Sequence, residues 1–527
     1  MNDNNNVQSA AAGRSAESLS KELYFFCKSE ALSEEVLHEI IGRYGLTPNC
    51  DARAHVDNYN FFHWVCCNER LTEGITRCLI EYFPDAASAT DKDGRSSLHC
   101  VFMNKSATLN IIRLLIDAAP ETVRSVSNDG MMPLHKLCGN RKVDEAAAVP
   151  ILKLLVEKYP EAARHADDQG VLPIHWASGW RSPEFCRLLI EAYPGSEQIG
   201  RGSGGQLPLH IACVKGSLAT VKLLYRQHPN AINHTASRGH YPIHAAISGI
   251  KHRDNPAAAV EIVQFLLDCD PDQKLQKYKG KSLLHYTCLR EFNDSNIEAG
   301  IQLIKIIFDV QPDAIEHDII VSDIYRYHQR VQAFINGELV FARQAKDLRM
   351  MNTPDDNGQL PLHTALQNNV RLGSIKLLVK GNPSALRTLE NNFALPLHIA
   401  CQHHDSASVV RYLLSIDEAA LEIVDKYGNT VLHYACRGAK YDTIAMLLEK
   451  YDAASVSKRN AHGKLPINLL WESNEGIDRE SVEYTDSIFQ LLRAYPEMVA
   501  ISNSMVNRPV DADTSLNGKK RKRSAFE

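Results

Sequence analysis

The stretch that decides the fold is Asp167-Asp168-Gln169-Gly170-Val171-Leu172-Pro173-Ile174-His175-Trp176-Ala177. Gly170 follows three polar residues and marks a turn that needs a positive φ. Pro173 suits the first position of a helix, where its missing N–H costs nothing. The apolar cluster that begins at Phe185 predicts a second helix, and Pro194 ends it. The stretch therefore predicts a turn, a short helix, a second turn and a second helix.

This pattern recurs along a chain of 527 residues. It ends at a histidine, and the intervals between neighbouring histidines are mostly 34 to 41 residues, with one of 78 residues. The histidines are His99, His135, His175, His210, His244, His285, His363, His398 and His433. Such a period is typical of a solenoid, in which units too small to bury their own apolar face stack on one another. We therefore expect an all-α stack of about eleven helix–turn–helix units.

The composition excludes several classes of protein. Hydrophobic residues make up 44% of the chain and charged residues 23%, as in ordinary proteins with an apolar core. A net charge of -5 provides no overall basic field, so a nucleic-acid partner is not expected. No apolar run approaches the roughly 18 residues of a membrane span, and the N-terminus lacks an apolar signal segment. We expect a cytoplasmic or nuclear protein that is neither secreted nor transmembrane.

Two units carry a resemblance to a known family. Gln206-Leu207-Pro208-Leu209-His210-Ile211-Ala212-Cys213 and Ala394-Leu395-Pro396-Leu397-His398-Ile399-Ala400-Cys401 resemble the ankyrin repeat, which has a Thr-Pro-Leu-His-x-Ala core. The Leu-Pro-Leu/Ile-His variant, with Tyr-Pro-x-Ala after the second helix, is similar to large multi-repeat ankyrin families of diatoms and related algae. The resemblance implies an all-α, ankyrin-repeat α-solenoid in which a β-turn finger precedes each pair of antiparallel helices.

The resemblance covers about 58–501 and suggests the following division of the chain. A disordered N-terminal tail (1–18) precedes a helical cap (19–56), a first block of repeats (57–312), an amphipathic helical insertion (313–357), a second block (358–503) and a disordered basic C-terminal tail (504–527). Spacing in the insertion predicts one or two helices, with Gly337 and Glu338 interrupting the middle. The insertion either folds onto its own repeats or serves as a docking or dimerisation helix. In four units the second helix ends later than usual, and we expect the extra residues between the two helices.

The sequence predicts structural roles for the recurring histidines and for six of the cysteines. In the ankyrin family the recurring histidine hydrogen-bonds backbone around the finger, and the resemblance carries this role to all nine histidines. Six cysteines occupy the same slot, three residues after the histidine or its counterpart His63, which predicts a small buried position. They are Cys66, Cys138, Cys213, Cys288, Cys401 and Cys436.

Motifs that imitate active sites lack essential parts. Gly280-Lys281-Ser282 resembles the end of a phosphate-binding loop, but Leu275 stands where that loop needs glycine. The chain has no His-Glu-x-x-His motif and no paired Cys-x-x-Cys pattern for zinc. We therefore predict a non-enzymatic protein with no catalytic residue, no cofactor, no metal and no small-molecule substrate.

The ankyrin resemblance implies that a polypeptide partner binds the concave side, on the fingers and first helices. The family's contact positions follow the finger glycine and lie four and five residues after the histidine. The predicted contact residues are Trp180, Arg181, Val214, Lys215, Gln206, His240, Gln402, His403 and Arg437. Trp180 and the adjacent Arg181 lead this set because aromatic and guanidinium groups are enriched at binding hot spots. The alternative is that Trp180 packs against the next unit.

Five consecutive cations, Lys519, Lys520, Arg521, Lys522 and Arg523, resemble a nuclear import signal that importin would bind. The alternative is a solvated charge cluster or a weak nucleic-acid contact. Two functions follow from the sequence. The first is a scaffold or adaptor that binds a polypeptide, and the second is a nuclear regulatory protein that tethers or sequesters a transcription or chromatin factor.

Overall fold

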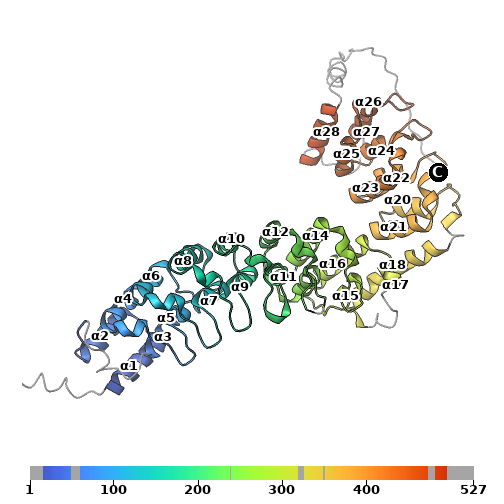
Figure 1. Ribbon diagram of the computed structural model, residues 1–527. Helices are drawn as coiled ribbons and strands as arrows, with labels where there is room; N and C mark the ends of the chain where they lie inside the picture. Colours follow the sequence, from blue (N-terminus) through green and yellow to red (C-terminus); the bar gives the residue numbers. More distant parts are fainter. Residues whose placement is uncertain are drawn as a thin grey trace, which may run out of the picture. The chain divides into compact units, whose positions relative to one another are not determined.

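The computed structural model describes residues 16–48, 60–237, 239–317, 326–347, 351–472 and 481–494. These residues form helices joined by turns, and their only β pairing consists of isolated bridges. The chain divides into two compact units, Met1–Phe334 and Ile335–Glu527, each built from stacked helix pairs (Figure 1). The all-α prediction is confirmed.

The first unit begins with two cap helices, α1 (Ala16–Lys28) and α2 (Glu34–Arg43). Seven helix pairs follow: α3 (Asn60–Cys66) and α4 (Glu73–Tyr82), α5 (Ser97–Val101) and α6 (Leu109–Ala118), α7 (Pro133–Gly139) and α8 (Glu145–Lys158), α9 (Pro173–Trp180) and α10 (Pro183–Ala192), α11 (Pro208–Lys215) and α12 (Leu218–Gln227), α13 (Pro242–Gly249) and α14 (Ala257–Cys269), and α15 (Leu283–Cys288) and α16 (Ile297–Val310). The first helix of each pair packs on the first helices of its neighbours, from α1 to α15. The second helices, α4 to α16, form a second row.

The second unit contains four helix pairs with the same arrangement. They are α20 (Pro361–Gln367) and α21 (Leu372–Gly381), α22 (Pro396–His403) and α23 (Ala407–Ile416), α24 (Val431–Arg437) and α25 (Tyr441–Leu448), and α27 (Pro466–Glu472) and α28 (Val482–Ala494), with the short α26 (Ala453–Val456) before the last pair. One core of buried Leu, Ile and Val side chains runs through these pairs. With the seven pairs of the first unit, the described residues contain the expected eleven pairs.

Local chemistry explains where these helices begin and end. Several second helices, among them α4, α6, α10 and α12, begin after a hydroxyl cap, as where Ser182 Oγ accepts the N–H of Phe185 at 3.2 Å. Most first helices begin at proline, and the histidine two residues later accepts the N–H that precedes the proline. Several of the prolines expected to end second helices begin short 3₁₀ helices, such as Pro120–Arg124, whereas Pro194 lies in a turn before the 3₁₀ helix Ser196–Gln198. The interpretation of the repeat from its prolines is confirmed.

Helix lengths correct one expectation. The second helices α8, α14, α16 and α28 have 13 or 14 residues, whereas α6, α10 and α12 have 10. The longer units therefore have about one additional turn in their second helix, because a turn takes about 3.6 residues. This turn accounts for much of their extra length. The remainder lies in the connection between the two helices. The spacing in the sequence predicts all of the extra residues in that connection.

The insertion contains α17 (Ala314–His317) and α18 (Gln329–Lys346). Helix α18 continues through Gly337 and Glu338, so these residues do not interrupt it. Within the first unit, Phe334 meets Phe308 edge to face, with ring centroids 5.9 Å apart. Within the second unit, Glu338 accepts a hydrogen bond from the Ser374 hydroxyl. These contacts favour the interpretation in which the insertion folds onto its own repeats.

The repeated cysteine slot is buried at all six positions, with exposed fractions of 0 or 1%. All six thiols are free, and burial raises their pKa. They are protonated, apolar packing groups, as the sequence predicts.

Candidate partner-binding surface

The fingers are tight turns that place their tips beside the first helices. Finger glycines have a positive φ, for example 71° at Gly170 and 61° at Gly205. A single antiparallel bridge closes several fingers, such as the bridge between Arg201 and Gln206. Asp167 fixes its finger by accepting the N–H groups of Gln169 and Val171.

The repeat histidines connect each finger to the next. His175 Nδ1 accepts the N–H of Leu172 at 3.1 Å, and Nε2 lies 3.0 Å from the carbonyl oxygen of Ile199 in the following finger. Equivalent pairs of bonds occur at His99, His135, His210, His363 and His433. Burial lowers the pKa of His99, His135, His175 and His210 to about 4, so each ring is neutral. The structural role that the resemblance implies is confirmed at these histidines.

Three histidines depart from this arrangement. His285 Nε2 lies 3.3 Å from Lys281 Nζ, whereas His244 and His398 each lie beside a tyrosine. Tyr286 lies edge to face with His244, with ring centroids 4.9 Å apart, and Tyr434 does the same with His398 at 5.1 Å. His244 Nε2 has no hydrogen-bond partner among the described residues. His398 Nε2 lies near two backbone carbonyls without a well-aligned bond. In each case the tyrosine follows the histidine of the next repeat.

Four predicted contact residues converge on one cavity of about 240 Å³. They are Trp180, Gln206, Val214 and Lys215, and the other lining residues are Val171, His175, Trp176, Arg201 and Ile211. The cavity lies between α9 and α11 and below two fingers. Close stacking of these helices shapes it, since a Cβ at Gly216 would lie 2.3 Å from the carbonyl oxygen of Ser178.

Trp180 lies within a cationic environment at this cavity. The Lys215 ammonium is 4.6 Å and the Arg141 guanidinium 4.7 Å from the centre of its ring. Both distances fall in the range of cation–π interaction. Trp180 is half-buried. Its indole therefore forms part of an accessible apolar wall with basic groups at the rim, and it also packs on the neighbouring repeat.

Arg181 has a different environment from Trp180. Its side chain is 2% exposed, and the guanidinium donates to the carbonyl oxygens of Leu137, Asn140 and Val143. Glu145 lies 3.3 Å from the same group. The Arg181 guanidinium is therefore buried and hydrogen-bonded within the protein, and it does not face the surface on which Trp180 lies.

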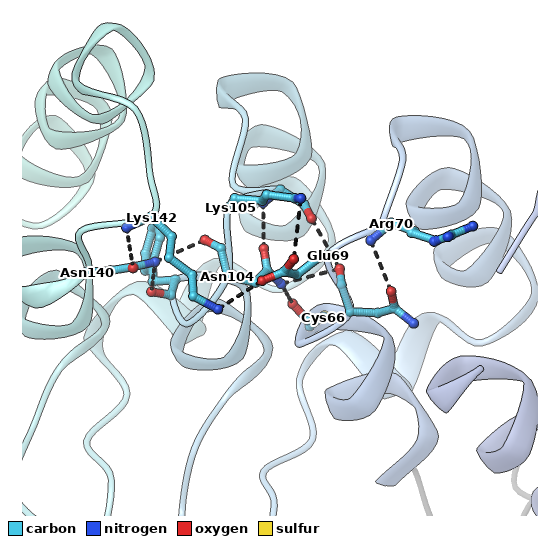
Figure 2. Close-up of polar contacts among 10 residues, drawn as sticks. Cys66, Glu69, Arg70, Asn104, Lys105, Asn140 and Lys142 are labelled. Carbon is cyan, nitrogen blue, oxygen red and sulfur yellow. Dashed lines mark hydrogen bonds and ion pairs between the residues drawn. The ribbon is translucent and has the colours of Figure 1, made fainter. Parts of the chain in front are cut away.

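Arg181 ends a ladder of side chains that the sequence analysis missed. Asn140 Nδ2 donates to the carbonyl oxygens of Phe102 and Asn104 at 2.7 and 2.9 Å, and Asn104 bonds in the same way to Cys66 (Figure 2). Lys105 and Lys142 both pair with Glu69 on the same edge, at 3.3 and 2.8 Å. A sequence signal existed, because Asn68, Asn104 and Asn140 each lie five residues after His63, His99 or His135.

His240 lies outside the Trp180 cavity. Its Nε2 is 3.2 Å from the Tyr286 hydroxyl, and its ring also meets Tyr278. Burial lowers its pKa to about 4, and Arg290 adds to this effect. His240 is therefore a neutral, partly exposed finger residue one repeat beyond the cavity.

The remaining predicted contacts lie on the second unit. Gln402 is half-buried and His403 exposed on α22, and Arg437 is exposed on α24. The two helices approach closely, because a Cβ at Gly438 would lie 2.0 Å from the carbonyl oxygen of Gln402. The Arg437 guanidinium lies 5.8 Å from the Tyr434 ring. The described residues show these three side chains on one stack of helices but no cavity that they share.

A larger cavity lies between the cap and the first repeat, which the sequence analysis did not identify. It measures about 1020 Å³, and its lining includes Tyr24, Phe25, Trp64 and Met103. The Lys28 ammonium lies 4.4 Å from the Trp64 ring. The aromatic runs Tyr24-Phe25-Phe26 and Phe61-Phe62 were visible in the sequence, but no periodicity joins them.

The predictions about metal, membrane and nuclear import can be compared only with the described residues. Within those residues no cluster of His, Cys, Asp or Glu has the arrangement of a metal site. No described helix is both long and apolar enough to cross a membrane. The basic run Lys519–Arg523 lies outside the described part of the chain.

Comparison with known families agrees with this geometry. A family model for ankyrin repeats in three copies matches residues 362–460, and a model for the single ankyrin repeat matches residues 204–236. The second match contains α11 and α12, and so includes one wall of the Trp180 cavity. No curated protein matches the chain.

Proposed function

Because the chain contains ankyrin repeats, we propose that it is a non-enzymatic scaffold or adaptor that binds a polypeptide partner. Ankyrin repeats point in general to protein–protein interaction. We place the principal contact on the fingers and first helices of the first unit, at the Trp180 cavity. The observation that supports this location is the convergence of Trp180, Gln206, Val214 and Lys215 on one cavity.

The arrangement suits insertion of one apolar side chain from an extended segment. Val171, Ile211 and Val214 provide aliphatic walls and Trp180 an aromatic one. Gln206, Arg201 and Lys215 provide polar groups that can bond to the segment's backbone. Apolar anchors in a largely preformed pocket, surrounded by polar groups, carry most of the affinity at such interfaces.

Selection from a library of displayed random peptides tests this function. We expect enriched peptides whose affinity for the full chain falls at least about tenfold in Trp180→Ala, as for a hot-spot residue. Phe489→Ala is the matched control, because Phe489 is an exposed aromatic residue on α28 of the other unit. The function is contradicted if selection enriches no peptide, or if Trp180→Ala binds every enriched peptide as well as the control.

We keep a nuclear regulatory role as a second candidate, supported by the basic run Lys519–Arg523. In this role importin recognises the run, and the repeats tether or sequester a nuclear factor. Replacement of all five cations by alanine in a fluorescently tagged full chain should abolish nuclear accumulation. Unchanged distribution would remove this candidate without affecting the scaffold proposal.

A further inference from the structure

Basic side chains follow the first helices on both sides of the Trp180 cavity. Arg141 follows α7, Lys215 ends α11, Lys251 follows α13 and Arg290 follows α15. We refer to these four residues as the basic strip. Each lies at the C-terminal end of a helix, where the helix dipole favours positive charge and lets the fold hold several cations together.

The members of the basic strip lie near one another in two pairs. Arg141 and Lys215 both lie over the Trp180 ring. Lys215 and Lys251 lie at the ends of α11 and α13, which pack against each other, and after burial both ammonium groups add to lowering the pKa of His252. Lys251 and Arg290 then line a second cavity of about 120 Å³ with Ser248, Ile250 and Leu289. The four cations therefore lie at the ends of first helices within one stack, from α7 to α15.

Among the described residues, acidic groups pair with only one member of the basic strip, Arg141. Asp254 pairs with Arg141 at 2.8 Å, but its side chain is 88% exposed. Glu291 also lines the second cavity. Within the described residues, Lys215, Lys251 and Arg290 form no ion pair, although the chain carries a net negative charge. Uncompensated cations at a binding surface favour and orient a partner of opposite charge.

The surroundings of the basic strip favour an acidic polypeptide over a nucleic acid. The walls of the Trp180 cavity are largely apolar, because aliphatic and tryptophan side chains make up most of the lining, and this suits an apolar side chain. Four cations are also few, because nucleic-acid binders commonly make roughly six to ten phosphate contacts. From this complementarity we propose that the partner segment is acidic, with aspartates or glutamates along the basic strip and one apolar side chain in the Trp180 cavity. This inference rests on the proposed function and adds the chemical class of the partner.

The test measures fluorescence anisotropy of the full chain with three probes at low and moderate salt. The first is a synthetic peptide with a central leucine flanked by glutamates, the second replaces each glutamate by lysine, and the third is a single-stranded RNA of similar length. We expect the acidic peptide to bind and the other two not to bind. Affinity should fall at least about tenfold in the double variant Lys215→Glu with Lys251→Glu, and also with added salt.

Lys153→Glu with Lys158→Glu is the matched control, because it makes the same change of net charge on the second helix α8. Its affinity for the acidic peptide should remain close to that of the wild type. Absence of acidic-peptide binding, equal binding of the lysine peptide or RNA, or equal effects of the two double variants would overturn the inference. Displayed peptides that depend on Trp180 but are neutral or basic would leave the proposed function standing and refute its acidic partner.

Discussion

At the scale of single residues, the repeat histidine determines how one finger meets the next. Its Nδ1 must accept an N–H and its Nε2 must donate to a carbonyl, so only the neutral ring can make both bonds. His135 shows the arrangement, with Met132 N–H on one side and the carbonyl oxygen of Val171 on the other. The fold should therefore depend on pH through these side chains.

Acidification should destabilise the protein between about pH 6.5 and 4. The pKa of His99, His135, His175 and His210 is about 4 in the fold, below the unfolded value of about 6.5. The unfolded chain therefore binds more protons in this interval. Stability is fully present above the unfolded pKa and is lost as pH falls toward the folded one, by about 2 kcal/mol per histidine at pH 5. Urea unfolding at pH 7.5, 6 and 5 measures the effect, and a constant free energy of unfolding would refute it.

Phe393 stands where other repeats have the finger glycine. Its φ is 62° and its side chain is 55% exposed. The left-handed region costs a residue with a Cβ about 1 to 2 kcal/mol. Phe393→Gly should therefore stabilise the fold by about 1 kcal/mol in urea unfolding, whereas Phe393→Ala should not. A loss of stability in the glycine variant would show that the phenyl ring contributes more than the backbone strain costs.

At the scale of elements, Arg181 joins the repeat of α9 to the preceding repeat. Its guanidinium bonds to carbonyl oxygens at the end of α7 and in the following loop. Arg181→Ala leaves these buried oxygens without donors, and we expect a loss of about 3 kcal/mol in the free energy of unfolding. Arg164→Ala provides a control, because the Arg164 side chain is exposed and its pairing with Glu161 is long, at 3.9 Å. Equal unfolding midpoints for the two variants would contradict the proposed link.

Sequence periodicity predicted the elements better than their ends. Turn glycines, helix-starting prolines and buried cysteines were all foreseen because each requirement acts within one repeat. The extra turn of α8 and the continuity of α18 were missed, since packing against neighbours decides where a helix ends. The sequence predicts Arg181 as a contact residue because it adjoins Trp180. In the fold Trp180 is partly accessible, but the Arg181 side chain is buried.

At the scale of the molecule, the contact residues predicted from the repeat lie in both units, because the same positions recur in each repeat. Only some of them lie close together in the fold. The sequence predicts Trp180, Gln206, Val214 and Lys215 as contact residues, and these four share a cavity. The aromatic cavity beside Trp64 and the basic strip escaped notice because their members come from different repeats at unequal spacing. Spatial neighbours across repeats leave no periodic signal in the chain.

Photocrosslinking from the Trp180 cavity is the most direct test of the central claim. A photoreactive phenylalanine analogue at Val214, or at Lys153 on α8 as the control, is irradiated in the full chain with a Trp180-dependent peptide. Mass spectrometry then locates the crosslinked peptide residue. We predict that Val214 crosslinks to one apolar residue of the peptide and that Lys153 does not crosslink. Equal crosslinking at both positions, or crosslinking at Lys153 alone, would contradict a polypeptide-binding surface at the Trp180 cavity.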